Sequence, residues 1–309
     1  MRVAITGGTG FVGRHLAERL GNPDTVVISR RTGVEIDDVN ALAAAFDGCE
    51  VVVHCAGINR EIGKQTFNRV HVDGTRAVIE AAQRAGVQRI VMLSFLRARP
   101  DCGSPYHETK WAAEELVRQS GMEHTILKAG MIYGPGDHMV DHVTRAVRTF
   151  PIFATVGCRE RTVRPVPVEE AVNVLVAAIE GRIPGSTVAV LGAEELELGA
   201  AVRRIARLAG GNPVYFRAPV WAIRVLAQLT EWIMVVPLVA KAQAQMLAEG
   251  VSEPVPYAPG LPEELRPVLP FDDHRIRAAL PEGRFGLNDL RLVRWWSGRR
   301  RGAKPGQAH

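Results

Sequence analysis

A glycine-rich turn near the start of the chain constrains its fold more than any other feature. Val3, Ala4 and Ile5 predict a short buried strand, which runs directly into Thr6–Gly13 (TGGTGFVG). Arg14–Leu20 follows, with apolar residues at helical spacing. This order is the setting of a dinucleotide site, because glycine lets the backbone turn tightly and approach a pyrophosphate closely. The helix then offers unpaired N–H groups to the anion; a turn that binds nothing is the alternative.

Apolar runs separated by amphipathic segments continue through the first half of the chain. Such runs, each followed by a helical pattern, indicate a parallel sheet with helices on both faces. The predicted fold class is therefore α/β, a Rossmann-type doubly wound parallel sheet. We predict strands over 25–29, 51–57, 89–94 and 124–128, and helices over 39–46, 72–85 and 110–119.

The second half of the chain has a less regular pattern. It predicts helices over 168–179 and 198–209, a strand over 187–191, an apolar stretch over 219–237 and a proline-rich stretch over 254–270. We therefore divide the chain into three parts. These are an NAD(P)-binding Rossmann domain over 1–195, a smaller, mainly helical C-terminal lobe for a substrate or partner over 196–283, and a basic tail over 284–309.

The formal charge of +5 is concentrated in the tail. Residues 284–309 carry a net charge of +6, so residues 1–283 sum to −1. A nearly neutral body argues against general nucleic-acid binding by that part of the chain. The tail also combines Trp295 and Trp296 with Arg299–Arg301, which suits the interface of an anionic membrane. A tail without a binding role is the alternative.

The cysteines and histidines show no metal-binding or disulfide pattern. The four cysteines lack CxxC spacing, which indicates reduced thiols in a cytosolic protein. His138 and His142 stand beside acidic residues that indicate a polar loop or the start of a helix, so we predict no metal site. Because nothing precedes the first strand, we expect no signal peptide and a cytoplasmic protein, with peripheral contact at the inner face of a membrane.

A tyrosine and a lysine stand four residues apart, at Tyr106 and Lys110. On a helix they share one face. A nearby ammonium favours the phenolate and lowers the pKa of a phenol from its usual value of about 10. Such a tyrosine can exchange a proton with a carbonyl or an alcohol while a nicotinamide carries hydride. Two ordinary surface residues are the alternative, but their position after a predicted parallel strand favours a site.

Five segments of the chain form a recognisable set: TGGTGFVG, HCAG, VDGT, YHETK and KAGMIYGPGD. Together they resemble the short-chain dehydrogenase/reductase superfamily in its extended and atypical branches, which include NAD-dependent epimerases and dehydratases. The resemblance covers residues 1–185. Within the superfamily, LSFLRARPDCGSPYHETKWAAEELVR, KAGMIYGPGD and WAIRVLAQLTEWIMVVPL resemble the NAD(P)-binding accessory subunit of respiratory complex I and its bacterial relatives.

The resemblance implies roles for the matching residues. Tyr106 is expected to be the catalytic acid/base, and Lys110 to hold the ribose hydroxyls of the cofactor and tune the tyrosine. His71 and Ala129 depart from the family, which commonly has asparagine and proline there. The implied cofactor-binding residues are Gly7, Gly10 and Gly13 in the pyrophosphate turn, Thr9 and Phe11 as flanking backbone donors, Ala56 and Gly57 against the adenosine half, and Lys128, where arginine is common, at the nicotinamide end.

One departure from the family bears on catalysis. The family's active-site serine or threonine normally stands a couple of residues beyond the first serine of its strand. Here that first serine is Ser94, and the matching position is Leu96, whose side chain cannot hydrogen-bond a carbonyl. Either Ser94 supplies the catalytic hydroxyl, a substrate or water replaces it, or the site does little chemistry. Loss of one oriented donor costs a factor of about 10²–10³.

Two arginines follow the second predicted strand. An NAD site usually carries an acid there for the ribose 2′-hydroxyl, whereas Arg30 and Arg31 suit a 2′-phosphate. We therefore predict NADP(H) in preference to NAD(H). Glu35 is expected to face the adenine amine. Two solvated charges with no role are the alternative.

The apolar stretch over 219–237 predicts an amphipathic helix that is too short and too charged to span a membrane. Trp221, Val225, Leu229, Trp232 and Val236 share one face, and the polar residues share another. The helix either covers the substrate lobe from within, as core or lid, or touches a bilayer or partner from outside.

Three functions fit these patterns. The first is an NAD(P)H-dependent oxidoreductase or epimerase that acts on a carbonyl or alcohol. The second is a weakly catalytic or non-catalytic cofactor-binding subunit or assembly factor at a respiratory or quinone-related membrane. The third, a redox sensor that reads NADP(H), is the least favoured.

Overall fold

The computed structural model describes residues 1–21, 23–183, 185–234, 241–286 and 289. At its centre is a six-stranded sheet in the order β2-β1-β3-β4-β5-β10, in which every neighbouring pair is parallel. The strand order reverses beside β1, because β2 lies on one side of β1 and β3 on the other. Such a switch point opens a crevice at the carboxyl ends of the strands. The strands are β1 (Val3–Thr6), β2 (Thr25–Ile28), β3 (Val51–His54), β4 (Arg89–Phe95), β5 (Glu123–Ala129) and β10 (Thr187–Val190).

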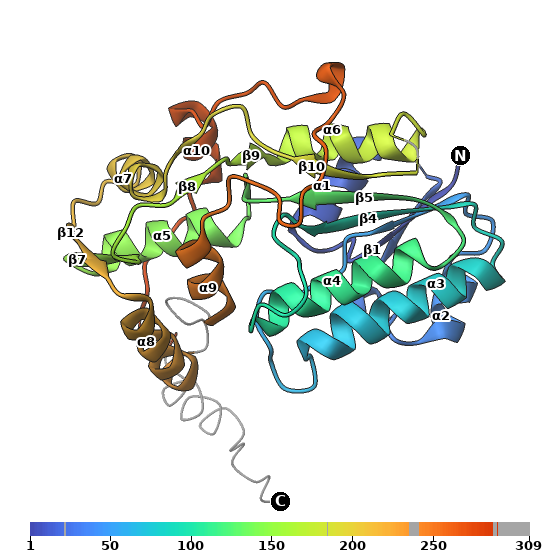
Figure 1. Ribbon diagram of the computed structural model, residues 1–309, viewed down its shortest axis with the longest axis horizontal. Coiled ribbons are helices and arrows are strands. Elements are labelled where there is room, and N and C mark those ends of the chain that lie inside the picture. The colour runs from blue at the N-terminus through green and yellow to red at the C-terminus, as the bar shows by residue number, and fades with distance from the viewer. Residues whose placement is uncertain (22, 184, 235–240, 287–288, 290–309) are drawn as a thin grey trace, which may run out of the picture.

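Helices cover both faces of the central sheet (Figure 1). Alternate residues of the strands pack against these two layers. Ile5 and Val53 face α1 (Phe11–Leu20) and α6 (Val168–Ile179). Val52 and its neighbours Ala4 and Ile90 face the other layer. That layer consists of α2 (Val39–Ala45), α3 (Gly74–Arg84) and α4 (Pro105–Arg118). Both faces are thus covered, which confirms the predicted doubly wound α/β sheet.

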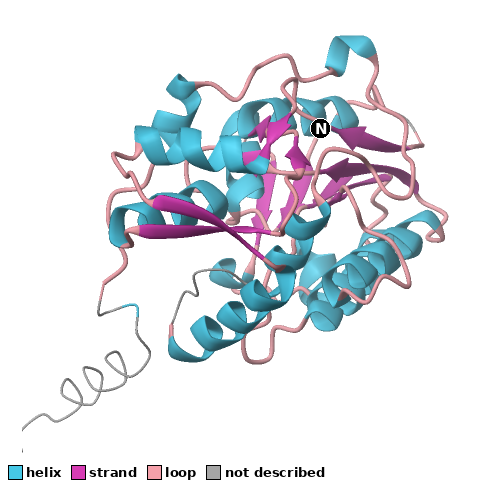
Figure 2. Cartoon of the chain, turned by 60° about the vertical axis from the view of Figure 1, so that its left-hand side comes forward, coloured by secondary structure: helices cyan, strands magenta, loops and turns pink. Residues whose placement is uncertain are grey.

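The remaining elements gather beside the sheet, where the β7–β12 pair lies apart from it (Figures 1 and 2). Their core joins residues of α5, α7 and α10 with Leu96 and Tyr106 from the sheet domain. The helices are α5 (His138–Thr149), α7 (Leu198–Leu208), α8 (Val220–Ile233), α9 (Lys241–Glu249) and α10 (Asp273–Ala279). The paired strands are β6 (Ile132–Tyr133) with β9 (Val166–Pro167), β7 (Ile152–Val156) with β12 (Val214–Ala218), and β8 (Thr162–Val163) with β11 (Leu196–Glu197).

Several helices begin earlier than the sequence predicts. Helix α4 begins at Pro105 rather than at residue 110, because proline fits the first helical position, where an N–H is not needed. Helix α3 follows directly on a π-helical turn, Asn68–Asp73, so helical structure there begins before residue 72. Asp137 accepts hydrogen bonds from the first turn of α5, so of the two alternatives near His138, a polar loop or the start of a helix, the structure has the helix start.

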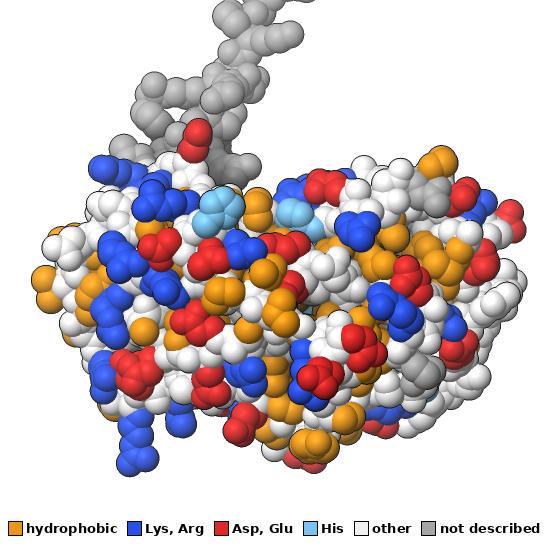
Figure 3. Space-filling model, turned by 90° about the horizontal axis from the view of Figure 1, so that it is seen from above, with side chains coloured by type: hydrophobic (Ala, Val, Ile, Leu, Met, Phe, Trp, Pro, Cys, Tyr) orange, Lys and Arg blue, Asp and Glu red, His pale blue; other side chains and the backbone are white. Residues whose placement is uncertain are grey.

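The surface combines charges of both signs. Acidic and basic side chains are interspersed over the face shown in Figure 3. No helix in the described part of the chain is both long enough and apolar enough to cross a bilayer.

Candidate functional site

The glycine turn brings the ends of β1 and β3 into direct contact. Gly7 has a φ of +69°, and a Cβ added to it would lie 2.7 Å from the backbone of Ala56. A Cβ on Gly13 would lie 2.4 Å from the carbonyl oxygen of Gly7. No side chain within the described residues caps the first turn of α1, whose N-cap is Gly10. The turn therefore fits a pyrophosphate, because the first N–H groups of α1 have no side-chain cap among the described residues.

Lys110 lies against the loop that follows β3. Its Nζ would be 3.2 Å from a Cβ built on Gly57, and it donates a hydrogen bond of 3.4 Å to the carbonyl oxygen of Leu93. Residues that are far apart in sequence thus meet at the carboxyl ends of β3 and β4. This convergence is the one that a parallel sheet predicts for its ligand site.

Two buried histidines lie behind this loop. His71 accepts a hydrogen bond from the Ile58 amide at Nε2 (3.2 Å), and its Nδ1 lies 2.9 Å from the Thr109 hydroxyl. His54 lies between the hydroxyls of Thr6 and Thr75. Burial lowers the pKa of His54 to about 3 and holds the pKa of His71 well below its ordinary value. Both rings are therefore neutral at neutral pH. His71 holds the loop after β3 through the Ile58 amide, a role that sequence patterns do not reveal.

Tyr106 is enclosed by aromatic rings. Its ring lies edge-on to Phe67, His71 and Phe95, with centroids 5.4–5.7 Å away, and its side chain is 6% exposed. Burial raises the pKa of the Tyr106 phenol above its ordinary value. The lowered pKa expected from the spacing to Lys110 is therefore not found, because loss of water around the phenol is the dominant effect.

Lys110 is equally buried. Burial lowers the pKa of its ammonium to about 8, although the charge of Glu114 opposes the shift. Tyr106 and Lys110 thus lie one helical turn apart on α4, as predicted. Burial thus favours the protonated phenol at Tyr106 and moves the pKa of the Lys110 ammonium toward neutral pH.

Leu96 is fully buried at the end of β4. Its side chain belongs to the same apolar cluster as Tyr106, and its backbone is bonded to Ala129 on one side and Val255 on the other. No hydroxyl therefore occupies this position, as the sequence indicates.

Ser94 and Lys128 meet at a third residue, Glu114 of α4. The Ser94 hydroxyl donates to Glu114 Oε1 at 2.6 Å, and Lys128 Nζ lies 3.0 Å from the same oxygen. Arg118 donates to the other carboxylate oxygen, and Lys128 also lies 5.3 Å from the Trp111 ring centre. The polar atoms of Ser94 and Lys128 are thus engaged with Glu114 beneath the site. Their catalytic and cofactor-binding roles stay predictions.

The residues after β2 are exposed and ordered by a local cap. Ser29 accepts hydrogen bonds from the amides of Arg31 and Thr32 in a short helical turn, Arg30–Thr32. Glu35 forms an ion pair of 3.8 Å with Arg69, which also holds Asp37. Arg30 and Arg31 thus follow the carboxyl end of β2 directly and are exposed, where the ribose end of a dinucleotide would lie.

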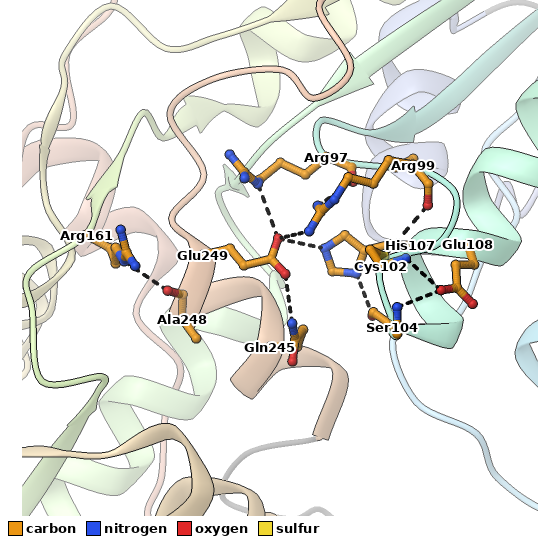
Figure 4. Close-up of polar contacts among 12 residues, drawn as sticks. Arg97, Arg99, Cys102, Ser104, His107, Glu108, Arg161, Gln245, Ala248 and Glu249 are labelled. Carbon is orange, nitrogen blue, oxygen red and sulfur yellow. Dashed lines mark hydrogen bonds and ion pairs between the residues drawn. The ribbon is translucent and has the colours of Figure 1, made fainter.

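A second polar group connects the two halves of the molecule (Figure 4). We name it the Glu249 cluster, after the carboxylate that ends α9. Glu249 Oε2 lies 2.8 Å from Arg99 and 3.4 Å from Arg97, both on the loop between β4 and α4. His107 completes the cluster, with Nδ1 2.6 Å from the Ser104 hydroxyl and Nε2 3.8 Å from Glu249. Sequence reasoning missed this cluster because its members are far apart along the chain.

No group of three or more potential metal ligands among histidine, cysteine, aspartate and glutamate occurs in the described ranges. The candidate site consists of three parts: the glycine cradle, the Tyr106–Lys110 pair and the loop after β3.

The sheet, its switch point and the glycine cradle define a Rossmann-type nucleotide-binding protein. Residues 3–180 match the NAD dependent epimerase/dehydratase family, and the chain belongs to that family. An NAD(P) cofactor is expected for its members, and the glycine cradle fits one.

Two curated relatives match part of the chain. Ceramide reductase of Caulobacter vibrioides is 36% identical over 191 residues, which are 57% of this chain and 60% of that protein. NADH dehydrogenase [ubiquinone] 1 alpha subcomplex subunit 9 of Mus musculus is 27% identical over 159 residues, which are 45% of this chain and 42% of that protein. The matches therefore cover less than two thirds of the length of either relative.

A solved structure extends the likeness of the fold to nearly the whole chain. The structure of MoeE5 in complex with UDP-glucuronic acid and NAD superposes with a TM-score of 0.64 at 21% identity, covering 98% of this chain and all of that one. The C-terminal elements thus belong to the fold seen there.

Proposed function

We propose that this protein is an NADP(H)-dependent oxidoreductase that reduces a carbonyl group, with Tyr106 as proton donor and Lys110 as its partner. The observation that carries the proposal is the position of this pair. Both side chains lie on one face of α4 at the carboxyl ends of β3 and β4, beside the glycine cradle. Bound NADPH would supply the hydride for such a reduction.

The protonation states favour the direction of reduction. The raised pKa of Tyr106 keeps its phenol protonated, so it can donate a proton to a carbonyl oxygen. The Lys110 ammonium, one helical turn away, would stabilise the phenolate left behind. Ser94 donates to Glu114, so we assign no step to its hydroxyl.

The surroundings of the tyrosine suit an apolar substrate. Phe67, Phe95 and Leu96 border Tyr106, and Leu96 replaces the hydroxyl that would bind a polar group. The name of the relative ceramide reductase points to the same kind of substrate, because a ceramide is largely hydrocarbon. We therefore propose a ketone within a long-chain lipid as the substrate class.

The preference for NADPH rests on Arg30 and Arg31. We expect isothermal titration calorimetry to give tighter binding of NADPH than of NADH. Arg30→Ser should weaken NADPH binding about tenfold and leave NADH binding unchanged, since only NADPH carries the 2′-phosphate. Arg182→Ser, a substitution at an exposed arginine that pairs with Glu180, is the matched control. Tighter binding of NADH to the wild-type protein would contradict the preference.

Catalysis is tested by Tyr106→Phe. We expect this variant to lose at least about 10²-fold in kcat, because it keeps the ring but removes the proton. Binding of NADPH should stay within about twofold, since the glycine cradle is untouched. The readout is NADPH consumption with a series of long-chain ketones in detergent micelles. Equal turnover by the variant and the wild-type protein would exclude the role of Tyr106.

A second function is favoured by one observation, the leucine at position 96. Without a hydroxyl there, the protein could bind its nucleotide and turn over slowly or not at all, as a subunit or assembly factor at a respiratory or quinone-related membrane. The likeness to the mouse subunit named above supports this reading. Tight NADPH binding with no ketone reduction by the wild-type protein would favour it over the oxidoreductase.

A further inference from the structure

Helix α8 presents its large apolar side chains to solvent. Trp221 and Trp232 are each 70% exposed, and Val225 and Ile233 are 53% and 52% exposed. Leu226 and Leu229 complete this group, which we call the α8 apolar face. The sequence allows either a core or lid helix or a helix that touches a bilayer or partner. The exposed tryptophans favour the second, because a core or lid helix would bury them. Val236, which we expected on the same face, lies outside the described residues.

The apolar face is continuous around the helix. At about 100° per residue, its six members occupy one arc of about 140°. The buried residues Ile223, Ala227 and Thr230 follow on one side of this arc and pack toward the body of the protein. The polar residues Arg224, Gln228 and Glu231 occupy the remaining edge. The fold therefore uses only a narrow part of the apolar surface of α8.

Side chains of this size are seldom left exposed together without a binding role, because burying them releases ordered water. The two tryptophans lie three turns apart, about 16 Å along the axis, with aliphatic residues between them. This distribution matches a helix that lies parallel to a membrane surface, where indole rings prefer the interface and aliphatic side chains enter the hydrocarbon. The helix has 14 residues, too few to span a bilayer.

We propose that α8 docks this protein on the surface of an anionic lipid bilayer, with the α8 apolar face buried at the boundary of headgroups and acyl chains. Charge supports this occupant over a protein partner. Residues 290–309 carry six basic and no acidic side chains in the sequence and would be drawn to anionic headgroups. The interfacial features that the sequence predicts in that tail, Trp295, Trp296 and Arg299–Arg301, lie outside the described residues. The proposal does not depend on the proposed enzymatic activity.

Vesicle flotation of the full chain tests the proposal. We expect the wild-type protein to float with vesicles of phosphatidylcholine and phosphatidylglycerol, and less with phosphatidylcholine alone. Trp221→Gln/Trp232→Gln should lower the fraction bound at limiting lipid by about tenfold, because both indoles leave the interface. Tyr257→Gln/Val268→Gln is the matched control, since those side chains are 85% and 74% exposed elsewhere and should not matter.

A second pair of substitutions in the α8 apolar face provides an independent test. Leu229→Gln/Ile233→Gln should reproduce the loss, which protects the test if the tryptophan variant fails to fold. The proposal is overturned if the wild-type protein does not float, if both α8 variants float like the wild-type protein, or if neutral vesicles bind as well as anionic ones. It is also overturned if analytical ultracentrifugation finds a dimer that the α8 variants dissociate while vesicle binding is absent, since a second copy would then cover the face.

Discussion

At the scale of single residues, Lys110 lowers the stability of the fold at the position where its proposed function requires it. Its ammonium is buried beside Gly57, and that burial lowers its pKa from 10.5 to about 8. Burial of a cation weakens the folded state, and the charge of Glu114 and the contact with the Leu93 carbonyl offset this cost in part. A residue that destabilises the fold at a cofactor site is most simply explained by a role in binding or catalysis.

We expect Lys110→Met to stabilise the protein at pH 7 while it weakens turnover. The shift in pKa corresponds to about 3 kcal/mol at most, so a gain of about 1–3 kcal/mol is expected. Between pH 8 and 10.5 the unfolded state binds more protons than the folded state, so the stability of the wild-type protein rises with pH. The variant lacks this rise, and its advantage should shrink there.

Urea unfolding across this pH range measures the effect. Lys64→Met, at an exposed lysine, is the control and should change neither the stability nor its pH dependence. If Lys110→Met is no more stable than the wild-type protein at pH 7, the Lys110 ammonium is better solvated or better paired than its surroundings suggest.

At the scale of elements, the central strands could be predicted because they are apolar throughout. β1, β3 and β4 carry runs of valine, isoleucine and leucine between helical patterns, and only a doubly covered parallel sheet buries both faces of such runs. The pairs β6–β9 and β8–β11 could not be predicted, since strands of two residues are too short to show a period.

The parts of the candidate site that are local patterns could be predicted from the sequence, and the contacts between distant residues could not. The glycine cradle and the Tyr106–Lys110 pair are local patterns, so their spacing alone indicates them. The contacts of Ser94 and Lys128 depend on the register of β4 and β5, which places these two residues side by side beneath Glu114. A sequence contains no local signal for such a register.

At the scale of the whole molecule, the Glu249 cluster ties the C-terminal helices to the sheet domain next to the site. Gln245 donates to Glu249 at 2.8 Å and accepts a hydrogen bond from Arg224 of α8. A continuous chain of polar contacts thus runs from the exposed helix α8, through α9, to the loop between β4 and α4. These contacts link α8 to the loop that carries Leu96 and leads to Tyr106.

Loss of the Glu249 carboxylate should loosen this connection without harming the nucleotide site. Glu249→Ala leaves Arg97 and Arg99, each about one-fifth exposed, without a counter-ion, and we expect a loss of about 1–3 kcal/mol in stability. Hydrogen exchange should accelerate in α9, while the Kd for NADPH should stay within about twofold, because the glycine cradle lies on other elements. Glu180→Ala removes an ion pair whose partners are about half exposed, and should cost less than about 0.5 kcal/mol. If the two variants behave alike, the cluster is an ordinary surface ion pair, and the two halves of the molecule are held together by their shared apolar core alone.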